Sequence, residues 1–321
     1  MRGLPLLAAA LLLVPAAGAQ RDALPRTAIF FYPWYGTPAR DGDYQHWQQN
    51  GHTPPRDLAA AYYPVRGAYS SSDPTVLAGQ MGDIERAGVD EVVTSWWGRG
   101  SPEDARLAAV IRAAHAHRLA VAAHLEPYPG RTVAGTALDI AYLRTLGIRD
   151  FFVYHATDFR AAEWTALTAR LSGERLFAQT TQVGFAKTAG FDGIYTYDIV
   201  TWGGNVFARV CTEARKLGLL CAPSVGPGYD ARRATSDTHV KLRRTGKTYD
   251  AMWTAALRAH ANLVTITSYN EWLEGTQIEP ARRRDGYRSY DGAWKMRGTA
   301  AQRSYVTRTA YWTARTSALQ P

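Results

Sequence analysis

Short runs of β-branched, aromatic and other apolar residues recur along the chain, and a polar loop closes each of them. Runs of this length that are apolar on both faces are typical of strands buried in a parallel sheet. We predict strands at residues 28–32, 91–96, 120–125, 150–155, 176–180, 193–197, 219–223 and 263–268.

Helical spacing of apolar residues separates these runs. The segment 77–87 ends at Gly88, and the segment 101–118 opens with Ser101, a proline and two acids, which are signals of a helix start. Further helices are predicted at residues 134–146, 161–171, 183–189, 206–217, 249–261 and 300–316. Eight βα units in about 300 residues predict a single-domain (β/α)8 TIM barrel. An open doubly wound sheet is the alternative, but neither a GxGxxG nor a Walker A motif supports nucleotide binding.

Aromatic, polar and acidic residues gather where several of these strands are predicted to end. The carboxyl ends of barrel strands converge on one face, where barrel enzymes hold their sites. Aromatic rings combine a flat apolar face with polar edges, which suits a sugar ring, while acids and amides bind its hydroxyls. The sequence therefore predicts a carbohydrate site. Its expected substrate-binding residues are Tyr32, Trp34, Tyr35, Trp96, Trp97, His124, Glu126, Tyr195, Tyr197, Asn270 and Trp272.

The last apolar run leads directly into the segment SYNEWLEGTQIEP, which holds Glu271, Glu274 and Glu279. Glu271 and Glu274 stand at positions i and i+3, so they share a face if the segment turns helically. Glycosidic cleavage commonly uses two carboxyl groups. Neighbouring like charges raise one pKa, which provides a proton donor near neutral pH. We predict that Glu271 and Glu274 are catalytic and that Glu279, which precedes a proline, is structural.

Composition is globular, with 46% hydrophobic and 20% charged residues in 321. The 10 Trp and 18 Tyr against 9 Phe favour a cleft for a polar ligand, although aromatic packing between helices and strands is an equal alternative for any one ring. The net charge of +9 comes largely from arginine pairs. No basic helix or RNA-binding signature accompanies them, so we expect a basic surface and no nucleic-acid partner.

The first 19 residues have the pattern of a cleavable secretory signal: one Arg, an apolar stretch and Ala17-Gly18-Ala19. The apolar stretch is too short to span a bilayer comfortably, and no later segment is long and apolar enough. We therefore expect a secreted or periplasmic protein without stable membrane insertion. Residues 20–321 are expected to form the catalytic domain, and nothing predicts more than a monomer.

Two cysteines and two neighbouring histidines raise other chemistries. Cys211 and Cys221 are predicted on a helix and the next strand, whose backbones usually lie too far apart for the ~5.5 Å Cα spacing of a disulfide. Although an exported protein could oxidise them, we expect two buried thiols. His115 and His117 are two apart on a predicted helix and cannot share one ion. The sequence holds no HExxH, clustered Cys/His set or GxSxG, so no metal or cofactor is expected.

Six motifs, taken together, resemble glycoside hydrolase family 99, the endo-α-1,2-mannosidases and endo-α-1,2-mannanases. They run in the family's order from Phe31 to Glu279 and read FYPWYG, AYSSSDP, HLEPY, FDGIYTY, PSVGPGY and ITSYNEWLEGTQIEP. The resemblance implies a (β/α)8 barrel that cleaves α-mannosidic bonds with retention. It also implies that the 2-hydroxyl of the substrate attacks the anomeric carbon and forms a 1,2-anhydro sugar.

The resemblance implies roles for particular residues. Glu271 would deprotonate the 2-hydroxyl, and Glu274 would protonate the leaving group and then activate water. Glu126 would bind substrate in the cleft, and the tyrosines of the motif FDGIYTY would line it. The chain departs from the family at Leu273, where the usual motif has His, and in a short stretch between Glu126 and Asp192. These departures leave open a hydrolase of another α-linked polysaccharide, or a carbohydrate-binding barrel without activity.

Overall fold

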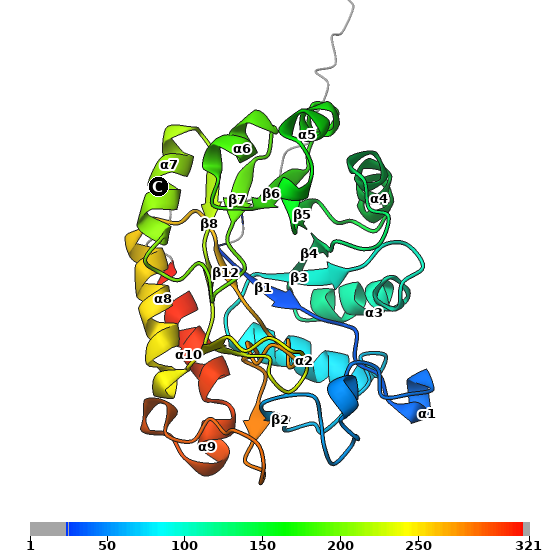
Figure 1. Cartoon of the computed structure of the whole chain (residues 1–321), viewed down its shortest axis with the longest axis vertical. Helices are drawn as coiled ribbons and strands as arrows, with labels where there is room; N and C mark the ends of the chain where they lie inside the picture. The colour runs from blue at the N-terminus through cyan, green and yellow to red at the C-terminus, as the bar shows by residue number, and fades with distance from the viewer. Residues whose placement is uncertain (1–23, 25, 317–321) are drawn as a thin grey trace, which may run out of the picture.

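The computed structural model describes residue 24 and residues 26–316. Its centre is a nine-stranded parallel sheet in the order β8-β7-β6-β5-β4-β3-β1-β12-β9 (Figure 1). The strands are β1 (Thr27–Phe31), β3 (Glu91–Trp96), β4 (Ala120–Leu125), β5 (Asp150–Val153), β6 (Arg175–Gln179), β7 (Gly193–Tyr195), β8 (Leu220–Ala222), β9 (Ser224–Val225) and β12 (Val264–Ile266).

Strands β8 and β9 form one barrel position, because only Pro223 separates them. β8 pairs with β7 and β9 pairs with β12, so the ring closes across this interruption. The proline explains it, since it has no N–H to donate to a neighbouring strand. The predicted (β/α)8 barrel is thus confirmed, with a strand at each of the eight predicted runs.

Helices surround the sheet at the positions that the apolar spacing predicts (Figure 1). They are α2 (Pro74–Arg86), α3 (Pro102–Ala116), α4 (Val133–Thr145), α5 (Ala161–Thr168), α6 (Val183–Thr188), α7 (Phe207–Lys216), α8 (Lys247–Arg258) and α10 (Ser304–Thr313), with two short helices, α1 (Pro38–Asp41) and α9 (Gly298–Gln302). Side-chain caps begin some of them: Ser101 accepts a hydrogen bond from the N–H of Asp104 at the start of α3.

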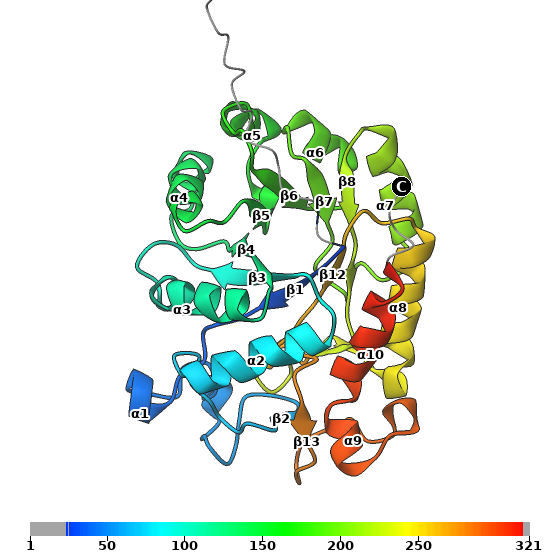
Figure 2. The same ribbon diagram turned by 180° about the vertical axis from the view of Figure 1, so that it is seen from behind.

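Two small antiparallel pairs lie outside the barrel and were not predicted. β2 (Tyr63–Pro64) pairs with β13 (Ala281–Arg282), at the end of the molecule where α9 also lies (Figure 2). β10 (Tyr229–Asp230) pairs with β11 (Val240–Lys241). We call residues 229–241 the β10–β11 hairpin, and it forms one wall of the site described below.

Alternate residues of the strands fill the barrel interior, which is packed and not a pore. The ring of Phe30 lies edge-on to Phe152 at 5.8 Å between centroids, and Phe152 stacks on Phe177 at 4.8 Å. The intervening residues face the helices, so a shift of one position moves a side chain from the barrel centre to the helical layer. This alternation decides below which aromatic residues reach the site.

The expectation of two free thiols is wrong, because Cys211 on α7 and Cys221 on β8 form a disulfide. Only residues 217–219 separate the helix from the strand, and this tight return brings the two Cα atoms to 5.2 Å. That separation lies within the range a disulfide accepts. A typical helix–strand packing distance was the wrong guide, because α7 approaches β8 closely enough at Cys211 for the two Cα atoms to meet the disulfide range.

The expected signal segment, residues 1–19, lies outside the described residues. Across the part of the chain that the structure covers, no helix has the length and apolar character needed to cross a bilayer.

Candidate active site

Glu271 and Glu274 lie on a tight turn directly after β12, at the carboxyl end of the barrel. Hydrogen bonds fix this turn: the N–H of Glu271 donates to Ser268 Oγ at 2.9 Å, and the N–H of Leu273 donates to Glu271 Oε1 at 3.0 Å. The N–H of Asp230 in the β10–β11 hairpin donates to the carbonyl of Glu274 at 2.8 Å. The turn therefore holds both acids at one point above the barrel.

Both acids lack a cationic partner among the described residues. Burial, and then the charge of Glu274, raise the pKa of Glu271 well above its usual range. Burial, and then the charges of Asp198, Glu126 and Asp237, raise the pKa of Glu274 to about 8. The pair thus retains a proton near neutral pH, as a general acid requires.

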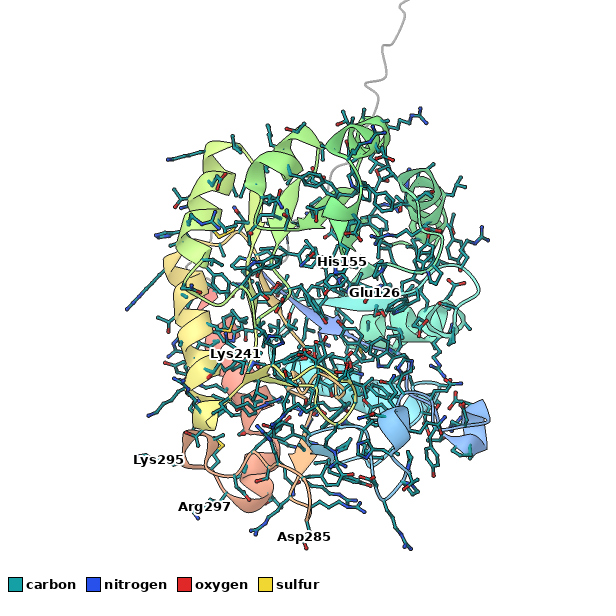
Figure 3. All side chains as sticks on the ribbon, in the orientation of Figure 1. Glu126, His155, Lys241, Asp285, Lys295 and Arg297 are labelled. Carbon is teal, nitrogen blue, oxygen red and sulfur yellow. A yellow bond between two sulfur atoms is a disulfide. The ribbon has the colours of Figure 1, made fainter. Side chains whose placement is uncertain are left out.

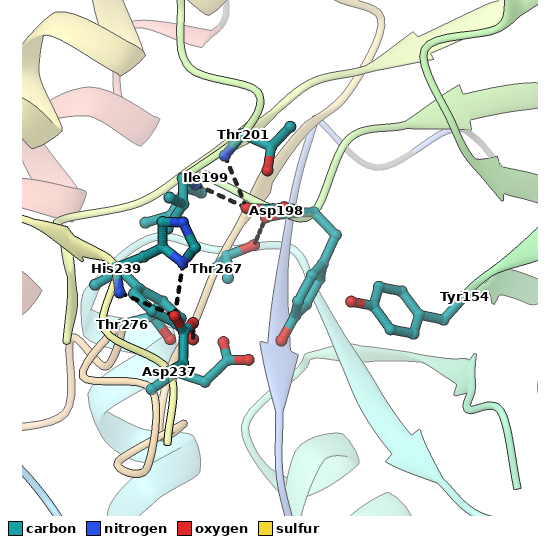
Figure 4. A pocket seen from close by; sticks show the side chains of 12 residues that line it. Tyr154, Asp198, Ile199, Thr201, Asp237, His239, Thr267 and Thr276 are labelled. Carbon is teal, nitrogen blue, oxygen red and sulfur yellow. Dashed lines mark hydrogen bonds and ion pairs between the residues drawn. The ribbon is translucent and has the colours of Figure 1, made fainter. Parts of the chain in front are cut away.

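A cavity of about 340 Å³ lies beside Glu274 (Figure 4). Asp198 and Asp237 line it with their carboxylates, and Tyr154, Tyr229 and His239 also face it. The hydroxyl of Tyr229 donates to Asp237 at 2.6 Å, and the N–H of His239 donates to the same carboxylate at 2.9 Å. Asp198 accepts hydrogen bonds from two backbone N–H groups of its own loop at 2.8 and 3.0 Å. The cavity is therefore polar, and its walls present acceptors for sugar hydroxyls.

Three of these lining residues had a signal that was not used, and two had none. Asp198 directly follows the motif FDGIYTY, Tyr229 ends the motif PSVGPGY, and Tyr154 lies in the predicted strand 150–155. His239 is two residues from Asp237, but both stand in a loop without a recognisable pattern. The β10–β11 hairpin brings this pair to the cavity, and sequence spacing does not predict that contact.

Tyr32 and Tyr197 form the floor of the site, and their hydroxyls share a hydrogen bond. Tyr197 has φ of 50°, in the left-handed region that non-glycine residues rarely adopt. Its N–H donates to Ser224 Oγ at 2.7 Å, and Thr267 Oγ1 donates to its carbonyl at 3.1 Å. The surrounding strands therefore hold the Tyr197 ring in place, and His124 stacks on it at 5.3 Å between centroids.

Glu126 lies over the middle of the strand ends, whereas Asp285, Lys295 and Arg297 lie at the edge of the molecule near α9 (Figure 3). The Oε1 of Glu126 accepts a hydrogen bond from Ser95 Oγ at 2.8 Å and lies 2.9 Å from Nδ1 of His124. The Nε2 of His124 in turn lies 2.9 Å from the hydroxyl of Tyr195. Glu126 is thus buried close enough to Glu271 and Glu274 for its charge to raise their pKa values. His124 and Tyr195 lie in the barrel interior, and none of the three residues lines the cavity.

The prediction that Trp96 faces substrate is wrong. Its Nε1 donates to Asp104 on α3 at 2.9 Å, and its ring faces Tyr128 and Tyr142 on the outer side of the barrel. The cause is the alternation along β3, which sends every second side chain to the helical layer. Trp97 is the next residue, has the same parity as inward-facing Ser95 and is partly exposed at the strand end.

Three further predicted contact residues support the turn and do not line the cavity. Trp272 is fully buried, and its Nε1 donates to Glu279 at 2.8 Å. Asn270 Oδ1 accepts from the N–H of Tyr32 at 2.7 Å, which ties the acidic turn to β1. The hydroxyl of Tyr35 donates to the carbonyl of Asn270 at 3.0 Å and accepts from the N–H of Trp272 at 3.0 Å. Their polar groups are used within the protein, which corrects their assignment as sugar ligands.

Trp34 is partly buried near the acids. It stacks on His46 at 4.5 Å between centroids and packs in an apolar cluster with Leu273, Ala59 and Ala234. Leu273, the residue that departs from the family motif, thus contributes to an apolar surface between the two acids and the Trp34 ring.

A (β/α)8 barrel that presents two uncompensated carboxyl groups, aromatic rings and a polar cavity at its carboxyl end has the arrangement of a glycoside hydrolase. In the described part of the chain, no group of three or more His, Cys, Asp or Glu side chains has the geometry to hold a metal ion.

The chain belongs to glycosyl hydrolase family 99, whose family model matches residues 25–318. The chain is 32% identical to a glycoprotein endo-α-1,2-mannosidase-like protein of Danio rerio, over 79% of this chain and 70% of the relative. It is 30% identical to the glycoprotein endo-α-1,2-mannosidase of Mus musculus, over 78% and 67%. It superposes on the GH99 endo-α-mannosidase of Bacteroides thetaiotaomicron with a TM-score of 0.82 and 29% identity, over 92% and 98%. The chain is thus a glycoside hydrolase of the endo-α-mannosidase family.

Proposed function

We propose that this protein is an exported, retaining, endo-acting hydrolase of α-mannosidic linkages, with α-1,2 linkages in mannan or mannose-containing glycans as its substrate. The observation that carries this proposal is the turn after β12, where Glu271 and Glu274 stand without a cation and Glu274 lines a polar cavity. The relatives named for cleavage of α-1,2-mannosidic bonds supply the linkage.

In the proposed reaction the 2-hydroxyl of the cleaved mannose is the nucleophile. It is axial and trans to an α-linked leaving group, so its oxygen is aligned for backside attack on the anomeric carbon. Glu271 removes the proton of this hydroxyl while Glu274 protonates the departing glycosidic oxygen, and a 1,2-anhydro sugar forms. Glu274 then deprotonates a water that attacks the anomeric carbon, Glu271 returns its proton to the 2-oxygen as the ring opens, and the anomeric configuration is retained. Holding an internal nucleophile in place supplies the large effective concentration of intramolecular reactions.

The surroundings of the two acids favour this division of roles. The backbone N–H groups of Leu273 and Glu274 donate to Glu271 and favour its ionised form. Glu274 faces the carboxylates of Asp198 and Asp237, whose charges favour its protonated form. Both carboxyl groups have a raised pKa, so the pair retains a proton, and the proposed reaction places this proton on Glu274 before the glycosidic bond breaks.

The test is incubation of the purified protein with α-1,2/α-1,3-branched mannan, with the products separated by size. We expect discrete short oligosaccharides from the native protein and from Glu213→Gln, a matched change on the exposed side of α7. Glu274→Gln should release none. Release of free mannose alone would contradict endo action, and undiminished cleavage by Glu274→Gln would overturn the acid assignment.

A second candidate is cleavage of another α-linked polysaccharide whose 2-hydroxyl participates. It is favoured by Leu273, which packs against Trp34 where the family motif has a histidine. A panel of α-glucans and α-mannans distinguishes the two candidates, because only one class should be cleaved efficiently. Export rests on the first 19 residues, and N-terminal sequencing of the protein recovered from outside the cytoplasm tests it.

A further inference from the structure

Arg243 follows β11 and lies behind the catalytic turn, with only 7% of its surface exposed. Its Nη2 donates to the carbonyl of Gly275 at 2.9 Å and to the carbonyl of Gln277 at 2.6 Å. These residues directly follow Glu274 along the chain. A single guanidinium nitrogen thus holds two points of the segment that carries the proposed acid.

The surroundings of this cation are aromatic and not acidic. No described Asp or Glu forms an ion pair with Arg243. Its Cζ lies instead 4.6, 4.9 and 4.5 Å from the ring centroids of Tyr62, Tyr290 and Tyr305. A charge buried without a counter-ion is unfavourable, and cation–π contacts offset only part of that cost. A neutral side chain would fill this space without the free-energy penalty of a buried charge. Packing alone therefore does not explain the guanidinium.

The two carbonyls supply that reason, because they belong to the backbone reversal that directly follows the proposed acid. Gly275 has φ of +66°, and a Cβ on it would lie 3.1 Å from the backbone of Asp230. The carbonyl of Glu274 is held by the N–H of Asp230, and the carbonyl of Gln277 also accepts from Tyr290 at 3.2 Å. For the carbonyl of Gly275, Arg243 is the donor that the structure shows. Release of this carbonyl would free the peptide next to Glu274.

We propose that Arg243 is a positioning residue for the reaction: it clamps the carbonyls of Gly275 and Gln277 and thereby fixes the Glu274 carboxyl relative to Glu271. This proposal deepens the function proposed above and rests on it. A displacement of about 1 Å at a reacting group lowers the rate by roughly 10²-fold, so a clamp behind the turn has a direct effect on turnover.

Arg243→Lys tests the clamp, because an ammonium keeps the charge but its nitrogen ends one bond short of the position of Nη2, the atom that donates to both carbonyls. Arg308→Lys is the matched control: Arg308 also lies against aromatic rings, 4.0 Å from the centroid of Tyr311, but its donors hold Asp250 on α8. We expect Arg243→Lys to lower kcat by roughly 10- to 100-fold with KM within about twofold. Arg308→Lys should leave both constants unchanged.

A readout without substrate separates this proposal from the proposed function. The titration of Glu274 is followed as the difference in unfolding midpoint between each protein and its Glu274→Gln partner, from pH 4 to 9. A loosened turn admits water to the carboxyl, so the titration should move to lower pH in Arg243→Lys and stay in place in Arg308→Lys. An unmoved titration in Arg243→Lys, or equal losses of kcat in both lysine variants, would overturn the clamp. Failure of the native protein to cleave any mannan would overturn the proposed function alone.

Discussion

Glu274 and Glu279 stand on the same loop in opposite surroundings. Glu279 is fully buried and accepts from Arg66 at 2.9 Å, Tyr69 at 2.7 Å, Gln80 at 3.0 Å and Trp272 at 2.8 Å. Glu274 opens on a cavity, faces other carboxylates and has no such set of donors. One loop thus carries an acid whose bonds are satisfied by the fold and an acid whose proton remains available. The number of donors, and not burial alone, separates a structural carboxylate from a reactive one.

The structural side of this comparison extends to a second acid. Arg66 bridges Glu279 and Asp83, with Nη2 2.9 Å from the Asp83 carboxylate. Arg86 and Arg303 reach the same carboxylate from the outside. Burial opposes ionisation of Asp83, but these three guanidinium groups hold its pKa below the usual range. The network links α2 to the loop after β12 and supports that loop from behind.

The largest expected effect is on the reactive side. Glu274→Gln should lower kcat by about 10³-fold, equivalent to about 4 kcal/mol of barrier, because it removes the proposed general acid. Its unfolding midpoint should not fall, since no ion pair is lost. Steady-state rates on mannan and a thermal melt measure both quantities. Retention of a tenth of the native rate would contradict the assignment.

The reverse pattern is expected for Glu279→Gln. It removes the charge that Arg66 faces inside the protein, so unfolding in urea should show a loss of about 3 kcal/mol. The folded fraction should retain its activity within about tenfold, because the residue does not face the cavity. A stable but inactive Glu279→Gln protein would erase the distinction between the two acids.

The pH dependence sharpens the same distinction. The folded pKa of Glu274, about 8, lies above its ordinary value of 4.5, so its contribution to stability is complete below pH 4.5 and is lost as pH rises through 8. The native protein should therefore lose on the order of 2 kcal/mol relative to Glu274→Gln across this window, after allowance for solvent screening. Urea unfolding at pH 4, 6 and 9 measures the difference, and a constant difference would contradict the raised pKa.

The smallest effect is expected at the rim of the structural network. Arg303 is half exposed, with 51% of its side chain accessible. When Arg303 is removed, Asp83 still forms its ion pairs with Arg66 and Arg86. Arg303→Ala should therefore cost less than about 1 kcal/mol and leave kcat unchanged. A loss comparable to that of Glu279→Gln would show that the network acts as one unit.

The features that local patterns carry were predicted well from the sequence. Each apolar run became a barrel strand, and the paired acids Glu271 and Glu274 stand at the predicted strand end. Errors arose where one position or one turn decides the outcome. Trp96 and Trp97 differ by a single residue, yet alternation along β3 places them on opposite sides of the barrel. Apolar character marks both as buried, but it does not report which face each one occupies.

The remaining errors concern contacts that depend on the tertiary structure. The disulfide depends on how tightly the chain returns from α7 to β8, which composition does not encode. The polar groups of Trp272 and Asn270 form hydrogen bonds with Glu279 and Tyr32, and only the fold brings these residues together. Asp237 and His239 reach the cavity because the β10–β11 hairpin folds over it, and no local signal announces that contact.

The β10–β11 hairpin is held at its base by the pairing of Tyr229 with Lys241 and of Asp230 with Val240, and Arg233 ties it to Asp57 and Leu58. Its hydrogen bond to the acidic turn passes through the backbone of Asp230, before the loop that carries Asp237. Exchanging residues 235–239, beyond Ala234, would therefore reshape the cavity wall without moving Glu271 or Glu274. The architecture is modular. Evolution or protein engineering could change which glycan the cavity binds while Glu271 and Glu274 stay in place.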